Sequence, residues 1–235
     1  MTTCVILQPS YIPWRGYFDQ IRRADVFVFY DDVQYDRRGW RNRNKIKTAS
    51  GAKWLTIPVL AKGNQAEHTP INEIQVCWDR DWASTHWASL RHAYADAPYF
   101  GAYAPMLEGF YARRPTLLAD FTIETTVALA RELGISATRF LRSSALGATG
   151  AKTDRLLRVL EAVGATRYIS GPSARDYIEA DKFERAGIPV EYMNYDYPQY
   201  EQLHPPYEPA VSIVDLLVMK GPSAGDFIWG SARGE

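Results

Sequence analysis

The sequence predicts an α/β fold: a three-layer, mostly parallel sheet with an inserted helical segment. The first observation is that two apolar runs rich in β-branched and aromatic residues, 5–7 and 26–30, each stop at polar residues, as buried strands do. The second is that residues 17–24 place apolar side chains at helical spacing. A strand, a helix and a strand within about 25 residues form a compact parallel crossover unit.

The next segment predicts a hairpin with a basic face. Residues 41–47 alternate so that Arg41, Arg43 and Lys45 share one face of a strand. Gly51 marks a turn, and residues 53–59 return as the second strand. Three cations on one face suit a phosphate or a carboxylate.

The middle of the chain changes from strands to helices. Residues 61–70 are polar and predict a surface loop, which is also a candidate for a mobile lid, and residues 71–76 predict a short strand. The inserted helical segment covers about 79–134. Its apolar spacing predicts helices over residues 81–94, 103–111 and 115–133.

The last third returns to alternating strands and helices. We expect a strand at 135–141, a linker or flexible catalytic loop at 143–151, a helix at 152–163, strands at 166–169 and 188–192, an irregular segment at 195–209 and a helix at 211–219. A Gly-containing turn after a strand presents free backbone N–H groups, which suit an anion. The residues of that phosphate or carboxylate turn are Ser170, Gly171, Ser173, Arg175 and Asp176.

Composition limits the class of protein. The 235 residues are 46% hydrophobic, and 27 Lys and Arg balance 27 Asp and Glu, so we expect one globular domain over 1–235 and a small-molecule partner rather than nucleic acid. No apolar run reaches 18 residues and the chain opens directly on a strand, which predicts a cytoplasmic protein without a membrane span. Cys4 and Cys77 are expected to be buried thiols, not a disulfide.

Polar residues follow the first two strands and predict a ligand site. In open α/β sheets ligands sit beyond the carboxyl ends of strands, so residues 8–16 and 31–35 should face one crevice. At most one of Asp31 and Asp32 points into it, because neighbours in an extended chain point opposite ways. A carboxylate there can bind Mg²⁺, hold an amine or act as general base. The alternative is a helix cap or a salt bridge.

These patterns select the candidate site residues. The candidate catalytic residues are Asp31, Asp32 and Arg15, and the candidate substrate-binding residues are Gln8, Tyr11, Trp14, Tyr17, Gln34, Trp40, Arg41, Asn42, Arg43, Asn44 and Lys45. We expect no metal pair from His86 and His92, which point in different directions on a helix. Ser212 and Asp215 form an S-x-x-D pattern typical of a capping box.

Several of these strings resemble the WbqC-like protein family, whose members occur among bacterial genes for surface polysaccharides. The matching motifs are QP at 8–9, P-x-x-GYF at 13–18, D-x-F-V-x-x-DDVQY at 25–35, W-x-N-R-N at 40–44, WLTIPV at 54–59 and S-I-x-D-L-L at 212–217. The resemblance implies transfer of glycine, or a similar aminoacyl group, onto an amino sugar. The family often continues with F-N-x-G, where this chain has Val218-Met219-Lys220-Gly221.

The opening unit is also similar, more faintly, to nucleotide-binding α/β folds with an HxGH signature after strand one. Residues 14–17 read WRGY, with the glycine in register and both histidines absent. Those histidines stabilise phosphate charge in the transition state. Arg15, or the face with Arg41, Arg43 and Lys45, would replace them electrostatically.

Two functions from different classes follow. The first is an aminoacyl (glycine-type) transferase or an ATP-dependent amide-forming ligase, using ATP and Mg²⁺, that acts on an amino sugar or similar small amine in surface-glycan or specialised metabolism. The alternative is a sugar-nucleotide or nucleic-acid binding protein without catalysis. The donor, the acceptor and the oligomeric state are not specified by any of these patterns.

Overall fold

The computed structural model describes residues 1–60 and 69–230 and confirms the α/β class. Its main sheet has five strands in the order β5-β2-β1-β6-β7, and every neighbouring pair is parallel. Val5 in the central strand aligns with Phe27 on one side and Ile169 on the other. The strands are β1 (Thr3–Leu7), β2 (Val26–Phe29), β5 (Arg139–Arg142), β6 (Arg167–Ser170) and β7 (Val190–Tyr192).

The strand order reverses between β1 and β6. From β1 the chain adds β2 and then β5 on one side, and it afterwards crosses to add β6 and β7 on the other side. Connections leaving two adjacent strands in opposite directions open a crevice at their carboxyl ends, where ligands of such sheets bind. In this protein the crevice lies just beyond Leu7 and Ser170.

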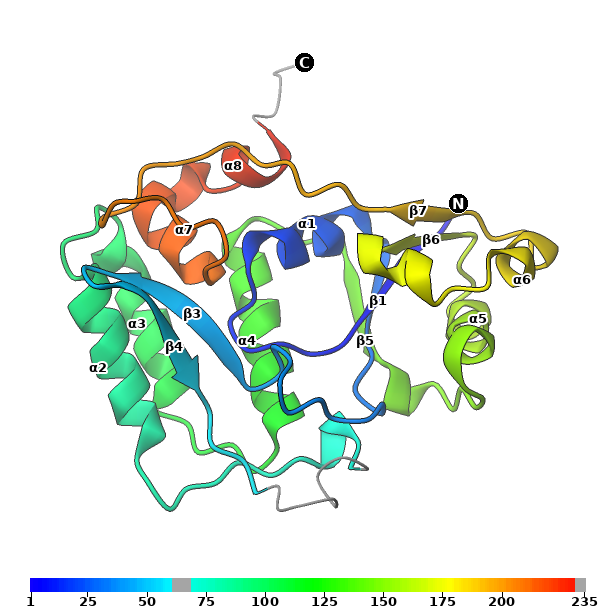
Figure 1. The fold of residues 1–235 in the computed structure, drawn as a ribbon, viewed down its shortest axis with the longest axis horizontal. Coiled ribbons are helices and arrows are strands. Elements are labelled where there is room, and N and C mark those ends of the chain that lie inside the picture. The colour runs from blue at the N-terminus through cyan, green and yellow to red at the C-terminus, as the bar shows by residue number, and fades with distance from the viewer. Residues whose placement is uncertain (61–68, 231–235) are drawn as a thin grey trace.

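Helices cover both faces of the sheet, giving three layers. Alternate residues of β1 point to opposite faces, so that Cys4 and Ile6 pack toward α5 (Lys152–Ala162) while Val5 joins the larger core. Figure 1 shows α5 and α6 (Ala180–Arg185) to the right of β1. Helices α2 (Trp82–Tyr94) and α3 (Phe100–Tyr111) lie at the left edge of the molecule in the same view.

The hairpin and the inserted helices lie between β2 and β5 in the chain. β3 (Arg43–Thr48) and β4 (Gly51–Thr56) form a separate antiparallel sheet, and α4 (Leu118–Glu132) follows α3. The strand predicted at 71–76 is wrong, because Ile71–Glu73 forms a 3-10 turn. Ile71 and Ile74 are both buried, three residues apart, which is the spacing of one helical turn rather than of a strand face. Most of the predicted loop at 61–70 lies outside the described residues.

The C-terminal part packs against the larger core. Residues 193–211 form the irregular segment, and α1 (Arg15–Arg23), α7 (Ile213–Lys220) and α8 (Asp226–Trp229) lie near one another at the top of Figure 1. None of the helices in the described ranges has the length and apolar character that crossing a bilayer requires. Both cysteines are free thiols, but only Cys4 is buried, whereas Cys77, which was expected to be buried, is half-buried. Burial raises the pKa of Cys4 to about 12.

The predicted capping box at the start of α7 is half correct. Ser212 caps the helix, because its hydroxyl accepts a hydrogen bond from the backbone N–H of Val214. Asp215 instead lies in the core and accepts hydrogen bonds from the hydroxyls of Tyr94 (3.0 Å) and Tyr200 (2.7 Å) and the amide of Gln202 (3.0 Å). Burial raises the pKa of Asp215.

Candidate functional site

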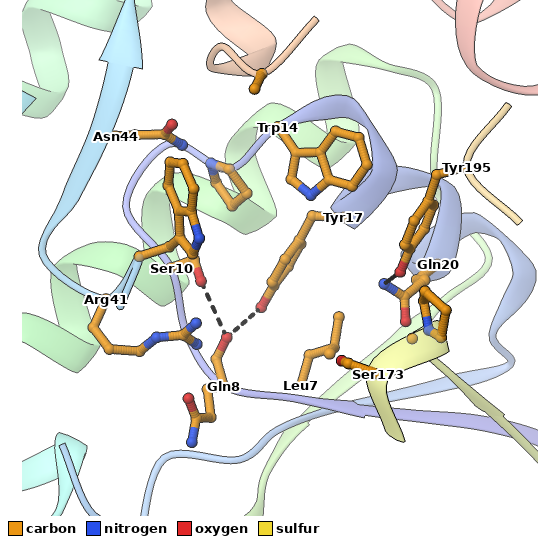
Figure 2. A pocket seen from close by; sticks show the side chains of 15 residues that line it. Leu7, Gln8, Ser10, Trp14, Tyr17, Gln20, Arg41, Asn44, Ser173 and Tyr195 are labelled. Atoms are coloured by element: carbon orange, nitrogen blue, oxygen red, sulfur yellow. Dashed lines mark hydrogen bonds between the residues drawn. The ribbon is translucent and has the colours of Figure 1, made fainter. Parts of the chain in front are cut away.

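A cavity of about 400 Å³ lies at the crevice between the ends of β1 and β6. Its walls are mostly aromatic and apolar, with a few polar side chains, which is the usual make-up of a small-molecule site. We call it the aromatic cavity (Figure 2). It is lined by Leu7, Gln8, Ser10, Pro13, Trp14, Tyr17, Gln20, Trp40, Arg41, Asn44, Gly171, Pro172, Ser173, Tyr195 and Ala210.

The loop that follows β1 is held in an unusual conformation. Ile12 has a φ of 35°, a value that β-branched residues rarely adopt. The side-chain amide of Asn44 donates to the carbonyls of Tyr11 (3.0 Å) and Ile12 (2.8 Å). The hydroxyl of Tyr17 donates to the carbonyl of Gln8 (3.1 Å). Strand β3 and helix α1 therefore fix the wall of the cavity from both sides.

An aromatic wall faces the cavity from α1 and the C-terminal segment. The rings of Trp14 and Tyr195 meet edge to face with centroids 5.0 Å apart. A Cβ atom on Gly16 would lie 2.4 Å from the Trp14 indole, so only glycine permits this ring position. The P-x-x-G-Y-F motif thus sets one side of the cavity.

Arg41 supplies the positive charge of the cavity. Its guanidinium donates one hydrogen bond, to the carbonyl of Pro9 (3.2 Å), and its Nε is buried without a partner. No ion pair joins it to a carboxylate within the described residues. Burial lowers the pKa of Arg41, although a guanidinium stays protonated at neutral pH. Most of its donors are therefore free to meet an anion.

Gln20 contributes a polar group that the sequence did not single out. The side chain is 3% exposed and its amide nitrogen donates to the Tyr195 hydroxyl (2.8 Å), while its Oε1 is buried without a hydrogen-bond partner. Its position three residues after Tyr17 places both on one helix face, a signal that was available in the sequence. Tyr195 lies in an irregular segment with no such periodicity.

The predicted residues divide into two groups. Those that the structure brings together around the aromatic cavity are Gln8, Trp14, Tyr17, Trp40, Arg41, Asn44, Gly171 and Ser173. Those that lie elsewhere are Tyr11, Arg15, Asp31, Asp32, Gln34, Asn42, Arg43, Lys45, Ser170, Arg175 and Asp176. The polar residues of the second group have identifiable roles in the fold, with Asp176 as an exception.

The two aspartates after β2 lie away from the aromatic cavity. The Asp31 carboxylate is fully buried and accepts hydrogen bonds from the backbone N–H (3.0 Å) and the hydroxyl (2.9 Å) of Ser144. Asp32 lies 2.5 Å from the guanidinium of Arg155 and 2.5 Å from the hydroxyl of Ser143. Both carboxylates therefore tie the end of β2 to the residues after β5, and their catalytic role stays a prediction.

Arg15 is buried in the contact between α1 and the C-terminal segment. Its guanidinium donates to the carbonyls of Pro198 (2.8 Å) and Phe227 (3.0 Å) and to the hydroxyl of Tyr207 (2.8 Å). These bonds occupy the group that would neutralise phosphate charge. The placement therefore favours a structural role for Arg15.

The single basic face predicted for residues 41–47 is only partly correct. Arg43 and Lys45 both lie over the ring of Trp54, at 4.6 and 5.4 Å from its centroid, and Trp54 contacts Trp40. Arg41 turns instead toward the aromatic cavity. The physical reason is that β3 begins only at Arg43, so strand alternation does not extend to residue 41.

The remaining predicted residues brace the surrounding structure. The Tyr11 hydroxyl lies 2.5 Å from that of Tyr111 in the core, and the Asn42 amide donates to the carbonyl of Ile57 (2.8 Å). The Ser170 hydroxyl donates to that of Tyr168 (3.2 Å). Gln34 forms an isolated bridge with Pro70, and Arg175 lies over the ring of Tyr192.

In the part of the chain that the structure describes, no protein-held Mg²⁺ site forms around the expected ligands Asp31 and Asp32. Nowhere in residues 1–60 and 69–230 do three or more His, Cys, Asp or Glu side chains gather as they would around a metal ion. The oxygens of Asp31 and Asp32, the expected ligands, are occupied by Ser143, Ser144 and Arg155. A magnesium ion here would have to be held by substrate phosphates and water.

The fold and site define a parallel α/β protein with an aromatic cavity at the point where its strand order reverses. The chain belongs to the WbqC-like protein family, whose model matches residues 8–227. It is 42% identical over 230 residues to an uncharacterized protein of Mycobacterium tuberculosis strain ATCC 25618 / H37Rv, covering 97% of this chain and 98% of that protein. No solved structure matches the chain.

Proposed function

We propose that the protein is an amide-forming aminoacyl transferase or ligase. It joins a glycine-type aminoacyl group to the amine of an amino sugar or similar small amine, in surface-polysaccharide or specialised metabolism. The observation that carries this proposal is the Arg41 guanidinium, mostly unpartnered, at an aromatic cavity where the strand order reverses. An activated acyl donor carries an anionic leaving group, which needs such a cation.

The chemical step is attack of the acceptor amine on the acyl carbon of the donor. A C–N bond forms, the C–O bond to a phosphate or nucleotide leaving group breaks, and the leaving oxygen keeps the electron pair. Arg41 stabilises the negative charge that develops on that oxygen. The amine loses one proton, which water or the leaving phosphate accepts, so charge and atoms balance.

The walls of the aromatic cavity support transfer to an amine rather than to water. Trp14, Tyr17 and Tyr195 cover the space beside Arg41 with apolar ring surface. Excluding water strengthens the electrostatic effect of the guanidinium and protects an activated acyl group from hydrolysis. Asp, Glu, His and Cys are absent from the described lining of this cavity, so catalysis here rests on orientation and charge.

A second candidate function is a sugar-nucleotide or nucleic-acid binding protein without catalysis. The observation that favours it is the exposed pair Trp40 and Trp54, with ring centroids 5.2 Å apart and two cations on Trp54. Exposed aromatic rings beside cations form the usual stacking platform for single-stranded nucleic acid. Oligonucleotide binding that weakens steeply with salt and is lost in Arg43→Ala would favour this function.

Product formation tests the proposed function directly. The purified protein is incubated with nucleotide-linked amino sugars, glycine, ATP and Mg²⁺, and the amide product is sought by mass spectrometry. Omitting ATP or Mg²⁺ in turn tests the predicted cofactors, and adding glycyl adenylate tests a preactivated donor. We expect product with the natural protein and with the control Arg91→Ala, which changes an exposed cation outside the cavity, and at least a tenfold slower rate with Arg41→Ala. Equal rates in both variants would contradict the role given to Arg41.

A further inference from the structure

A second cavity of about 800 Å³ adjoins the aromatic cavity on the α5 side of the sheet. Both cavities are lined by Leu7, Gln8 and Arg41, at the carboxyl end of the central strand. The second cavity, which we call the polar cavity for its charged residues Lys152, Asp176 and Glu179, is also lined by Tyr30, Tyr177 and several apolar residues. The two spaces are therefore neighbours with one common border.

Arg41 lies at that common border, whereas a second cation, Lys152, lies in the wall of the polar cavity alone. Arg41 keeps most of its donors unpaired, as described above, and its Nε is buried without a partner. Figure 2 shows the side-chain amide of Gln8 pointing away from the rings of Trp14 and Tyr17. A ligand that uses both cavities would thus place its anionic group in its middle, with one arm in each cavity.

The aromatic cavity fits a flat ring that carries a hydrogen-bond donor. Trp14 and Tyr195 offer ring surface, and the buried Oε1 of Gln20 has no donor to satisfy it. A buried amide oxygen without a partner is costly unless a bound molecule supplies the missing N–H or O–H. A nucleobase provides both the flat ring and the N–H.

The polar cavity fits an amine. Its wall includes Asp176, an exposed residue whose carboxylate makes no hydrogen bond or ion pair with the described residues. The neighbouring acid Glu179 differs, because it pairs with Lys182 at 3.1 Å. Asp176 is therefore the carboxylate of this wall that remains available to a protonated amine.

We infer that one ligand spans both cavities and that it is a nucleoside phosphate with an amine beyond its phosphate. The base lies in the aromatic cavity, the phosphate at Arg41 and the amine at Asp176. Two compounds share this chemistry: a nucleoside diphosphate amino sugar and an aminoacyl nucleotide. The inference rests on the site of the proposed function and names its substrate class, but it concerns binding and does not require the chemical step.

Binding measurements on the full chain test the inference. The probes are uridine diphosphate glucosamine, uridine diphosphate glucose, which lacks the amine, and glycylsulfamoyl adenosine, a stable mimic of an aminoacyl nucleotide. Titration calorimetry should give tighter binding of at least one amine-bearing probe than of the sugar nucleotide without an amine. Arg41→Ala should weaken that probe about 10- to 100-fold, since a hydrogen-bonded charge is lost. The control Arg91→Ala removes an exposed cation on α2 that lines neither cavity, and it should leave binding unchanged.

Asp176→Asn tests the contact with the amine of the ligand separately from the contact with its phosphate. It should weaken an amine-bearing probe about two- to fivefold, as expected for an exposed ion pair, and leave uridine diphosphate glucose unchanged. Which amine-bearing probe responds identifies the source of the ligand. The inference would be overturned by equal losses in Arg41→Ala and Arg91→Ala. It would also be overturned by an equal effect of Asp176→Asn on probes with and without the amine, or if none of the three probes binds. Binding with the expected pattern but no amide product would overturn the proposed function alone.

Discussion

The hydroxyl of Tyr11 lies 2.9 Å from Nδ1 of His86, and both side chains are buried beneath the loop that walls the aromatic cavity. Burial lowers the pKa of His86 from 6.5 to about 4, against the opposing effect of a hydrogen bond with the backbone of Thr56. The neutral imidazole can therefore accept a hydrogen bond from the Tyr11 hydroxyl, next to Ile12 with its positive φ.

Acid should therefore destabilise the protein through His86. The unfolded chain protonates this residue near pH 6.5 and the folded chain only near pH 4, so the free energy of unfolding falls as the pH falls through that range. The loss should approach about 3 kcal/mol at the low end. Urea unfolding at pH 7 and pH 4.5 measures it.

Two variants separate His86 from other groups that titrate in the same range. His86→Gln, which cannot be protonated, should show a smaller loss of stability with acid than the natural protein. His92→Gln, at an exposed position of the same helix, should retain the full loss. An identical acid dependence in all three proteins would show that His86 does not carry the effect.

Replacing Asp31 should lower stability rather than remove a catalytic group. Asp31→Asn places an amide nitrogen where the backbone N–H and hydroxyl of Ser144 now donate, so we expect a loss of about 1–3 kcal/mol in the free energy of unfolding. Ligand affinity of the folded variant, measured by calorimetry well below its melting temperature, should stay unchanged. A loss of ligand affinity without a loss of stability would show instead that Asp31 acts at the ligand site.

Local sequence patterns predicted the sheet and one side of the site, because burial of a strand and the position just after it depend on neighbouring residues in the chain. The run from Val26 to Phe29 is apolar in every position, as a strand buried on both faces must be. Gln8 was expected to face a crevice because it follows a parallel strand, and Gly171 was expected in an anion-binding turn after a strand. Both line the aromatic cavity. A positive charge at Arg41 was expected because cations on one strand face suit a phosphate or a carboxylate.

Long-range contacts explain most of what the sequence did not predict. From the sequence, Asp31 and Asp32 suit an active site as well as a structural role. The hydrogen-bond partners of Asp31, Ser143 and Ser144, lie 112 and 113 residues away in the chain, so no local pattern pointed to them. Tyr195 belongs to a segment without periodicity, so nothing local indicated that its ring would meet Trp14. Such pairings depend on the whole fold.

Arg15 should behave as a structural residue. Arg15→Lys keeps the charge but loses the planar fork that meets Pro198, Phe227 and Tyr207, so we expect about 2 kcal/mol lower stability in urea unfolding. Arg22→Lys, an exposed position on the same helix, should change stability by less than about 0.5 kcal/mol. A loss of ligand affinity in folded Arg15→Lys protein, without loss of stability, would contradict this assignment.

Gly16→Ala should reshape the aromatic cavity without adding any group to its lining. The new Cβ would lie 2.4 Å from the Trp14 indole, so the ring must move, and we expect a change in tryptophan fluorescence and about tenfold weaker ligand binding. Ordinary helix propensity predicts the opposite, a gain of about 0.8–1 kcal/mol for Gly to Ala. Gly101→Ala, on α3 with open space around it, should show that gain and unchanged binding. If both variants gain stability and bind equally well, the indole position does not depend on Gly16.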